Sequence, residues 1–255
     1  MNIAPSFLTP KVQRHFPLLF SQFIIALLLA SLFLPFTASL WQKIDIGVFK
    51  ALNLPLENSP VFRNFWALAN HRMADWLEDL FFVALFLVAI FSRKKQDRKK
   101  LTAELIFAAL LTALTIILFN RLLCRDLLKL RRASPSLVID QAILLSDYLS
   151  SITFKIVSSK SFPGDHATTA LLFTSCYAYF VRGKLGILAL LYGVFLCLPR
   201  LAVGAHWFSD IIVGSGCIAL FSLSWALFTP FASKCVKTIE KGLSLIPFFR
   251  KVKVE

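Results

Sequence analysis

The chain has 255 residues, of which 57% are hydrophobic and 16% charged, and its formal net charge is +14. A soluble domain carries about a quarter charged residues, so this composition excludes an ordinary soluble protein and favours a membrane protein. A strongly basic chain can also indicate nucleic-acid binding, but long apolar runs separate the basic residues here, and we expect no nucleic-acid partner.

Six apolar runs follow one another along the chain. Runs of this length and composition predict an all-α, polytopic membrane protein with six transmembrane helices. The first run exceeds the roughly 7–15 residues of a cleavable signal core, so we expect an uncleaved anchor. The expected spans are roughly 16–40, 76–92, 101–119, 167–182, 185–203 and 207–229.

Basic residues mark one side of the predicted membrane. They lie between the second and third spans, between the fourth and fifth, and in the tail: Arg93, Lys94, Lys95, Arg98, Lys99, Lys100, Arg182, Lys184 and the lysines from 234 to 253. Short loops rich in Lys and Arg stay in the cytoplasm. We therefore expect both termini inside, and residues 41–75, 120–166 and about 200–209 outside.

The expected organisation is a single domain over residues 1–255. Its core covers about 66–230, and residues 231–255 form a basic cytoplasmic tail. Apolar residues among the lysines of this tail suggest an amphipathic helix on the membrane surface; they are Leu243, Ile246, Phe248 and Phe249.

The first candidate binding segment is a basic cluster in the outer region. Five cations fall within twelve residues: Arg121, Arg125, Lys129, Arg131 and Arg132. Arginine presents a planar fork of donors to phosphate oxygens, so the cluster predicts phosphate binding, with Arg132 the foremost candidate because Ser134 and Pro135 follow it. Contact with anionic lipid headgroups is the alternative.

The second segment runs from Ser161 to His166. Pro163 and Gly164 predict a turn, and Asp165 an N-cap for the helix that follows. Free N–H groups at a helix start suit an oxyanion, and His166 there could protonate a leaving oxygen. The alternative is a capped helix with an incidental histidine.

The third segment contains Arg200, His206 and Asp210, spaced by six and four residues. If the last helix begins near Ala205, the histidine and the aspartate share one face. A carboxylate on one ring nitrogen fixes the tautomer and leaves the other nitrogen free to attack. Pro199 and Gly204 predict a bend that turns Arg200 toward the histidine.

The alternative for this third segment is a set of interfacial residues, with Trp207 in an aromatic belt. Other polar residues in spans have simpler interpretations. Glu78, Asp79 and Glu104 lie near span ends and are expected to be interfacial, with a proton relay as the alternative. Ser215, between two glycines, suits helix packing better than an intramembrane protease. The five cysteines show no C-x-x-C spacing, which gives neither a zinc site nor a disulfide framework.

Together the three segments resemble the type-2 phosphatidic acid phosphatase (PAP2) superfamily, whose signature is K-x6-RP, PSGH and SR-x5-H-x3-D. Arg200, His206 and Asp210 match the third motif, with Pro199 in place of Ser. Pro163 and His166 match the second, with Gly-Asp in place of Ser-Gly. In the first motif, Arg132 is followed by Ala-Ser-Pro, and Arg125 stands where the family has Lys, a role that Lys129 or Arg131 could also take.

Within the superfamily, R-A-S-P, S-F-P-G-D-H and P-R-x4-A-H-W-F-x-D-I-I-V-G-S look very like the lipid A 1-diphosphate synthases of Gram-negative inner membranes. The stretch from Leu68 to Arg72 is also similar, and the likeness runs from about residue 66 to 230. The resemblance implies a PAP2-type helical bundle in the bacterial inner membrane, with a periplasmic active site. It implies transfer of a phosphoryl group from undecaprenyl diphosphate to the 1-phosphate of lipid A.

Carried onto this chain, the resemblance implies that His206 is the nucleophile, oriented by Asp210, and that His166 is the general acid. Arg132, Arg200, Arg131 and Arg125 would bind the phosphate, and no metal or cofactor is expected because arginines can neutralise its charge. One alternative is a phosphatase that uses water as the acceptor at the same site. Another is a non-catalytic lipid-binding or transport protein. The sequence indicates no oligomeric state.

Overall fold

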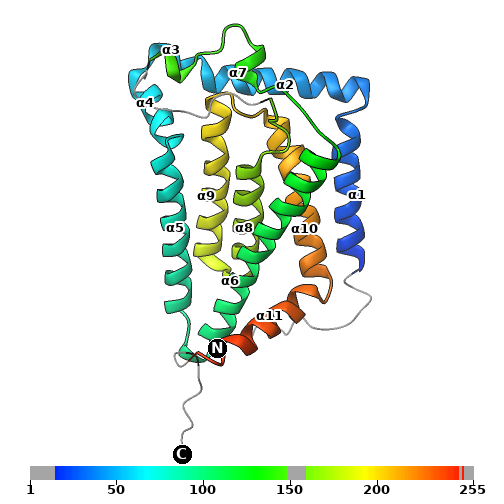
Figure 1. Cartoon of the computed structure of the whole chain (residues 1–255), viewed down its shortest axis with the longest axis vertical. Helices are drawn as coiled ribbons and strands as arrows, with labels where there is room; N and C mark the ends of the chain where they lie inside the picture. Colours follow the sequence, from blue (N-terminus) through cyan, green and yellow to red (C-terminus); the bar gives the residue numbers. More distant parts are fainter. Residues whose placement is uncertain (1–14, 149–158, 247–248, 250–255) are drawn as a thin grey trace, which may run out of the picture.

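The computed structural model describes residues 15–148, 159–246 and 249. Most of these residues are helical, and no strand occurs among them, which confirms the all-α class. The helices α1, α5, α6, α8, α9 and α10 run roughly along the long axis of the molecule, whereas α2 lies across one end and α11 near the other (Figure 1). We call the α2 end the upper end and the α11 end the lower end.

The helices have the following bounds: α1 His15–Ser31, α2 Pro35–Asn53, α3 Pro55–Asn58, α4 Pro60–Ala69, α5 Arg72–Phe91, α6 Lys95–Thr115, α7 Pro135–Val138, α8 Asp165–Val181, α9 Gly183–Ala202, α10 Gly216–Phe228 and α11 Phe231–Leu243. The π-helical segment η2 (Ile116–Leu127) continues α6, and a second π-helical segment, η4 (Asp210–Ser215), leads into α10. Between them, η3 (Leu145–Asp147) is a short 3-10 turn.

Helix α8 forms the centre of the bundle and packs against α6, α9 and α10. Small residues allow α8 and α9 to approach closely: a Cβ added to Gly186 would lie 3.2 Å from the Cα of Ala178, and one added to Gly193 would overlap the side chain of Thr174. Helix α1 packs on the outside of α10, where Ile25 contacts a buried group that includes Val213 and Cys217.

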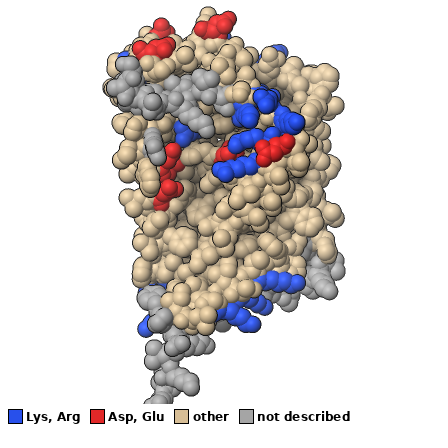
Figure 2. Space-filling view, viewed as in Figure 1, with Lys and Arg blue, Asp and Glu red and all other residues tan. Residues whose placement is uncertain are grey.

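Within the described parts of the chain, three helical segments are long and apolar enough to cross a membrane: Lys95–Leu127, Gly183–Ala202 and Asp210–Phe228. A fourth crossing is possible if the bent pair α1 and α2–α3 counts as one span. Charged atoms gather near the two ends of the molecule, with a broad uncharged band between them (Figure 2). The molecule therefore has the surface of a membrane protein.

The first expected span, 16–40, does not run straight. Helix α1 ends at Ser31, and the chain turns by 83° into the helix that begins at Pro35. Leu34 is extended, as a residue before proline prefers, and Pro35 occupies the first turn of α2, where its missing N–H costs nothing. The part of the run after Ser31 thus lies across the upper end.

The other expected elements need smaller corrections. The third span was expected to end at 119, but η2 continues the helix to Leu127. Residues 41–75, expected as an outer region, are largely helical as α2, α3 and α4. At the lower end, the expected tail contains the helix α11, which packs against α6 through Val236 and Leu243. The residues 1–14, 149–158, 247–248 and 250–255, including Phe248 of the expected amphipathic segment, lie outside the described residues.

Candidate active site

Hydrogen bonds join the three sequence segments at the upper end. The backbone N–H and the hydroxyl of Ser161 both donate to the carbonyl of Arg132, at 2.9 and 3.1 Å. The indole N–H of Trp207 donates to the carbonyl of Ala133 at 2.8 Å. These contacts place the basic segment, the histidine loop and the His206 turn side by side.

Ser215 adds a further link between two of these segments. Its hydroxyl is fully buried and donates to the carbonyl of Gly164 at 2.9 Å. This contact matches the packing role expected for Ser215 and leaves its hydroxyl engaged with the backbone.

A tight turn after α9 brings His206 back over the end of that helix. Gly204 has a φ of +74°, a conformation that favours glycine, and an added Cβ there would lie 2.8 Å from the Phe49 ring. The N–H of Ala205 then donates to the carbonyl of Arg200 at 2.9 Å. The predicted bend at Gly204 is confirmed, whereas Pro199 lies inside α9 and does not end it.

The imidazole of His206 is held by the backbone. Its Nδ1 lies 2.6 Å from the carbonyl oxygen of Ser161. Because a carbonyl only accepts, Nδ1 carries the hydrogen and Nε2 keeps its lone pair. Burial lowers the pKa of His206 below its ordinary value of 6.5, against the opposing effects of Asp210 and the Ser161 carbonyl. Burial thus favours the neutral ring, which the Ser161 carbonyl holds in one orientation.

Asp210 does not orient His206 through the direct hydrogen bond that the spacing predicts. Its Oδ2 lies 3.9 Å from Nδ1 of His206 and instead accepts from the backbone N–H of Trp207 at 2.8 Å. The expected helix start near Ala205 is wrong, since His206 lies in the turn and Asp210 begins η4. Asp210 thus acts on the ring by charge, while the carbonyl of Ser161 fixes the tautomer.

Arg132 belongs to a buried polar network. Its Nη1 donates to Asp210 at 2.6 Å, and its Nη2 to Asp45 of α2 at 2.8 Å. Asp45 is 1% exposed and also accepts from the N–H and the hydroxyl of Ser209, at 2.8 and 2.6 Å. The guanidinium lies 5.2 Å from the ring of Trp207. The network fixes the position of Arg132, whose side chain is still 34% exposed and can meet an anion.

Arg200 is oriented by residues just before and within α5. Its Nη1 donates to the amide oxygen of Asn70 at 2.9 Å, and its Nη2 to Asp75 at 3.1 Å. The amide nitrogen of Asn70 donates to the carbonyls of Trp66 and Pro199. Asn70 lies in the stretch from Leu68 to Arg72 and couples it to the third motif.

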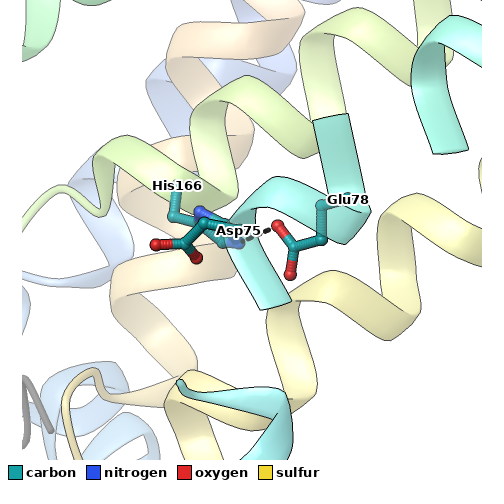
Figure 3. Close-up of side chains that lie close together, drawn as sticks. All are labelled: Asp75, Glu78 and His166. Carbon is teal, nitrogen blue, oxygen red and sulfur yellow. Dashed lines mark ion pairs between the residues drawn. The ribbon is translucent and has the colours of Figure 1, made fainter. Parts of the chain in front are cut away.

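His166 is the second residue of α8 and pairs with an acidic residue of α5. Its Nε2 lies 3.1 Å from the carboxylate of Glu78, and Asp75 lies on the same side of α5 (Figure 3). The charges of Arg200 and His166 both act on His206 and lower its pKa. The structure therefore brings both histidines and Arg200 into one site.

Arg125 and Asp165, two of the residues that depart from the general superfamily pattern, contact each other. An Nη2 of Arg125 lies 3.1 Å from Asp165, whose other oxygen accepts from Asn120 at 3.1 Å. Asp165 begins α8 but is not its N-cap, which is Gly164. The expected capping role of Asp165 is wrong, because its carboxylate binds two residues of η2 instead.

The remaining basic residues of the first segment, Arg121, Lys129 and Arg131, are exposed. Lys129 has a φ of +51°, which marks the turn from η2 toward Arg131. On the visible face, basic and acidic side chains lie close together around a hollow near the upper end (Figure 2). These cations are thus available to an anionic ligand from solution or from the membrane.

A cavity of about 860 Å³ extends from the site along the bundle between α5, α6 and α8. Its upper part is lined by polar residues, among them Glu78, Arg121 and His166, and the rest by apolar side chains such as Phe86, Ala113 and Phe173. A long apolar cavity with one charged end suits an amphiphilic ligand.

Asp75, Glu78 and His166 are the group whose spacing could hold a metal ion, with one ligand atom from each within 4.8 Å. All three residues already have ion-pair partners, since Arg200 pairs with Asp75 and His166 with Glu78. We therefore interpret the group as a network of ion pairs.

Comparison with known proteins agrees with this geometry. The model of the PAP2 superfamily matches residues 127–234. Over 218 residues, the chain is 34% identical to lipid A 1-diphosphate synthase of Escherichia coli (strain K12), with 85% of this chain and 89% of that protein covered. The chain belongs to the PAP2 superfamily. It is an enzyme of that superfamily, and no solved structure matches it.

Three residues of this PAP2 site were not candidates on sequence grounds. Asp45 binds Arg132, Asn70 binds Arg200, and Glu78 binds His166. Asn70 lies in the stretch from Leu68 to Arg72, which resembles the lipid A 1-diphosphate synthases. Glu78 is expected from the sequence to be an interfacial residue. Nothing in the sequence around Asp45 indicates a link to Arg132, because the two are 87 residues apart.

Proposed function

We propose that the protein is a membrane phosphotransferase that moves a phosphoryl group from undecaprenyl diphosphate to the 1-phosphate of lipid A through a phosphohistidine. The observation that carries the proposal is the state of His206: the Ser161 carbonyl holds Nδ1 at 2.6 Å and leaves Nε2 for the substrate, and Arg200 lies near enough for its charge to act on the ring. The relative named lipid A 1-diphosphate synthase supports the choice of lipid A as the acceptor.

In the first half-reaction, Nε2 of His206 attacks the terminal phosphorus, and the bond from that phosphorus to the bridging oxygen breaks. His166 gives a proton to the departing undecaprenyl phosphate. Arg132 and Arg200, with Arg131 and Arg125 near the same end, balance the charge of the phosphoryl oxygens. In the second half-reaction, an oxygen of the 1-phosphate attacks the phosphohistidine and the P–N bond breaks.

The cavity between α5, α6 and α8 supports a lipid as the donor. A long isoprenoid chain would lie against its apolar walls, with the diphosphate at the end lined by Arg121 and His166. The chain then stays in the membrane while its headgroup reacts.

The proposed topology has six membrane-crossing helices in the bacterial inner membrane, namely α1, α5, α6 with η2, α8, α9 and η4 with α10. The upper end would face the periplasm and the lower end, rich in lysine and arginine, the cytoplasm. An impermeant thiol reagent, applied to intact spheroplasts of a variant with Cys235→Ser, should label Glu57→Cys and leave Lys95→Cys unlabelled. Labelling of Lys95→Cys alone would reverse the topology.

Water is the competing acceptor. Asp75, next to Arg200, has a side chain that is 51% exposed, so water reaches the edge of the site. If water attacks the phosphohistidine, the same residues make a lipid diphosphate phosphatase.

The deciding experiment supplies purified protein with undecaprenyl diphosphate labelled on its terminal phosphate, with and without lipid A. Label on lipid A, absent with His206→Ala, is the expected result. Release of free phosphate at equal rates in both samples would make the protein a phosphatase. Transfer that survives His206→Ala would disprove the phosphohistidine mechanism.

A further inference from the structure

The pair formed by His166 and Glu78 bears on how the general acid works. Nε2 of His166 lies 3.1 Å from Oε2 of Glu78, and the Glu78 side chain is only 13% exposed (Figure 3). An ionised carboxylate only accepts hydrogen bonds, so the hydrogen on Nε2 of His166 is donated to Glu78. The nitrogen that remains for the substrate is Nδ1.

We infer that Glu78 is a positioning residue that holds Nε2 of His166 and so makes Nδ1 the nitrogen that exchanges protons with the substrate. The inference rests on the proposed function. His206 shows the same arrangement with the nitrogens exchanged, because the Ser161 carbonyl holds its Nδ1 and leaves Nε2 free. One histidine thus presents Nε2 to phosphorus, and the other presents Nδ1 to the leaving oxygen.

The proton balance follows from this arrangement. In the first half-reaction, His166 carries hydrogens on both nitrogens, and the Nδ1 proton moves to the bridging oxygen as its bond to phosphorus breaks. The ring that remains is neutral, with its hydrogen on Nε2 and bonded to Glu78. Nδ1 then has the lone pair required to take a proton from the acceptor in the second half-reaction.

Helix α5 holds Glu78 firmly in this position. His71 caps the helix by accepting the N–H of Met73 at 3.1 Å, and the ion pair between Asp75 and Arg200 ties its first turn to α9. One turn further on, Phe81 and Phe82 pack on the ring of Tyr192. Glu78 therefore lies on a helix fixed both above and below it.

The test compares Glu78→Gln with the wild-type protein in the label-transfer assay. Glu78→Gln should lower kcat by about 10- to 100-fold, within the range that positioned proton transfer contributes, with little change in KM for the donor. Glu57→Gln, the same substitution at an exposed residue of α3, is the matched control and should leave the rate unchanged. Glu78→Asp keeps the charge but shortens the side chain, and should also lose rate.

A further readout separates positioning from a merely structural role. In a His166→Ala background, Glu78→Gln should add little further loss, because both changes remove one function.

A Glu78→Gln protein with a wild-type rate would overturn the inference, as would a full additional loss in the His166→Ala background. Should Glu78→Gln fail to accumulate, a wild-type rate in Glu78→Asp would overturn it equally. Failure of the proposed function is distinct, since it appears as no transfer of label by the wild-type protein.

Discussion

Each of the two histidines of the candidate site is held at one ring nitrogen by a neighbouring group. Sequence spacing identified His206, His166, Asp210, Arg200 and Arg132, and the structure places them at one end of the bundle. Spacing did not identify what holds them: the backbone carbonyl of Ser161 and the carboxylates of Asp45 and Glu78. A carbonyl contact has no side-chain signature, so no reading of residue types could have found it.

The pKa of His206 leads to a prediction for the pH dependence of phosphoryl-enzyme formation. Burial lowers this pKa below 6.5, and only the neutral ring attacks phosphorus. The rate should therefore stay high as the pH falls to 6.5 and decline with a midpoint below that value. Rapid-quench measurement of labelled protein across about pH 5 to 8 gives the midpoint.

Asp210→Asn is the matched comparison for this pH profile. Asp210 favours the charged ring of His206, so the neutral amide should move the acid midpoint further down. A wild-type midpoint at or above pH 6.5, or an upward shift in Asp210→Asn, would contradict the proposed electrostatics.

Asp45→Asn should weaken both the fold and the activity. Asp45 is 1% exposed and binds Arg132 and Ser209, so the amide leaves one of these donors without its charged acceptor. We expect a loss of about 1–3 kcal/mol in the free energy of unfolding. We also expect a lower kcat, because Arg132 loses one of its two carboxylate partners. Thermal unfolding in detergent and the transfer assay measure the two effects.

The same substitution at an exposed aspartate, Asp140→Asn, provides the control for Asp45→Asn. Both the unfolding temperature and the rate should remain at wild-type values in that protein. Equal behaviour of the two variants would show that Asp45 contributes nothing through Arg132.

At the level of helices, hydropathy predicted that the chain is helical but not where each helix changes direction. The run 16–40 stays largely apolar through the 83° turn, and Pro35 begins the helix that follows it. Pro55 and Pro60 occupy the first turns of α3 and α4, a position typical of proline, and would have predicted those helices in the outer region. The π-helical course of η2 depends on contacts with α8, such as Asn120 with Asp165, and these are tertiary.

The contact between α8 and α9 predicts a large effect for one glycine. A Cβ at Gly193 would overlap Thr174, which is 1% exposed and donates to the carbonyl of Ala170 at 2.7 Å. Because Thr174 is branched and held, Gly193→Ala should separate the helices and cost about 1–3 kcal/mol. Thermal unfolding of the purified protein measures the loss.

Gly47→Ala on α2 is the control for Gly193→Ala. A Cβ there meets no atom within 4 Å, and alanine favours a helix over glycine by about 1 kcal/mol. The Gly47→Ala protein should be as stable as the wild type or slightly more stable. Similar losses at both glycines would mean that close packing of α8 on α9 does not decide the outcome.

At the level of the whole molecule, the candidate site lies at one end of an apolar bundle, and the cavity of about 860 Å³ extends from it between α5, α6 and α8. The charges of the sequence predict a sidedness, because Lys and Arg are counted without any coordinates, and this sidedness stays a prediction. The sequence could not predict the cavity, because the cavity depends on how the side chains of α5 and α6 pack beside α8. These side chains leave part of that space unfilled.

This cavity predicts how the enzyme distinguishes lipids. Ala113 lines the cavity, and Ala113→Phe should narrow the cavity at the place proposed for the lipid chain of the donor. Because remote binding energy holds the donor in place, KM for the long-chain donor should rise by about 10-fold, the equivalent of about 1.4 kcal/mol, while a short-chain lipid diphosphate should be little affected. Ala26→Phe, at an exposed position of α1 away from the cavity, is the control and should change neither value. An equal rise for both donors in Ala113→Phe would place the chain elsewhere and leave the cavity without a role in donor binding.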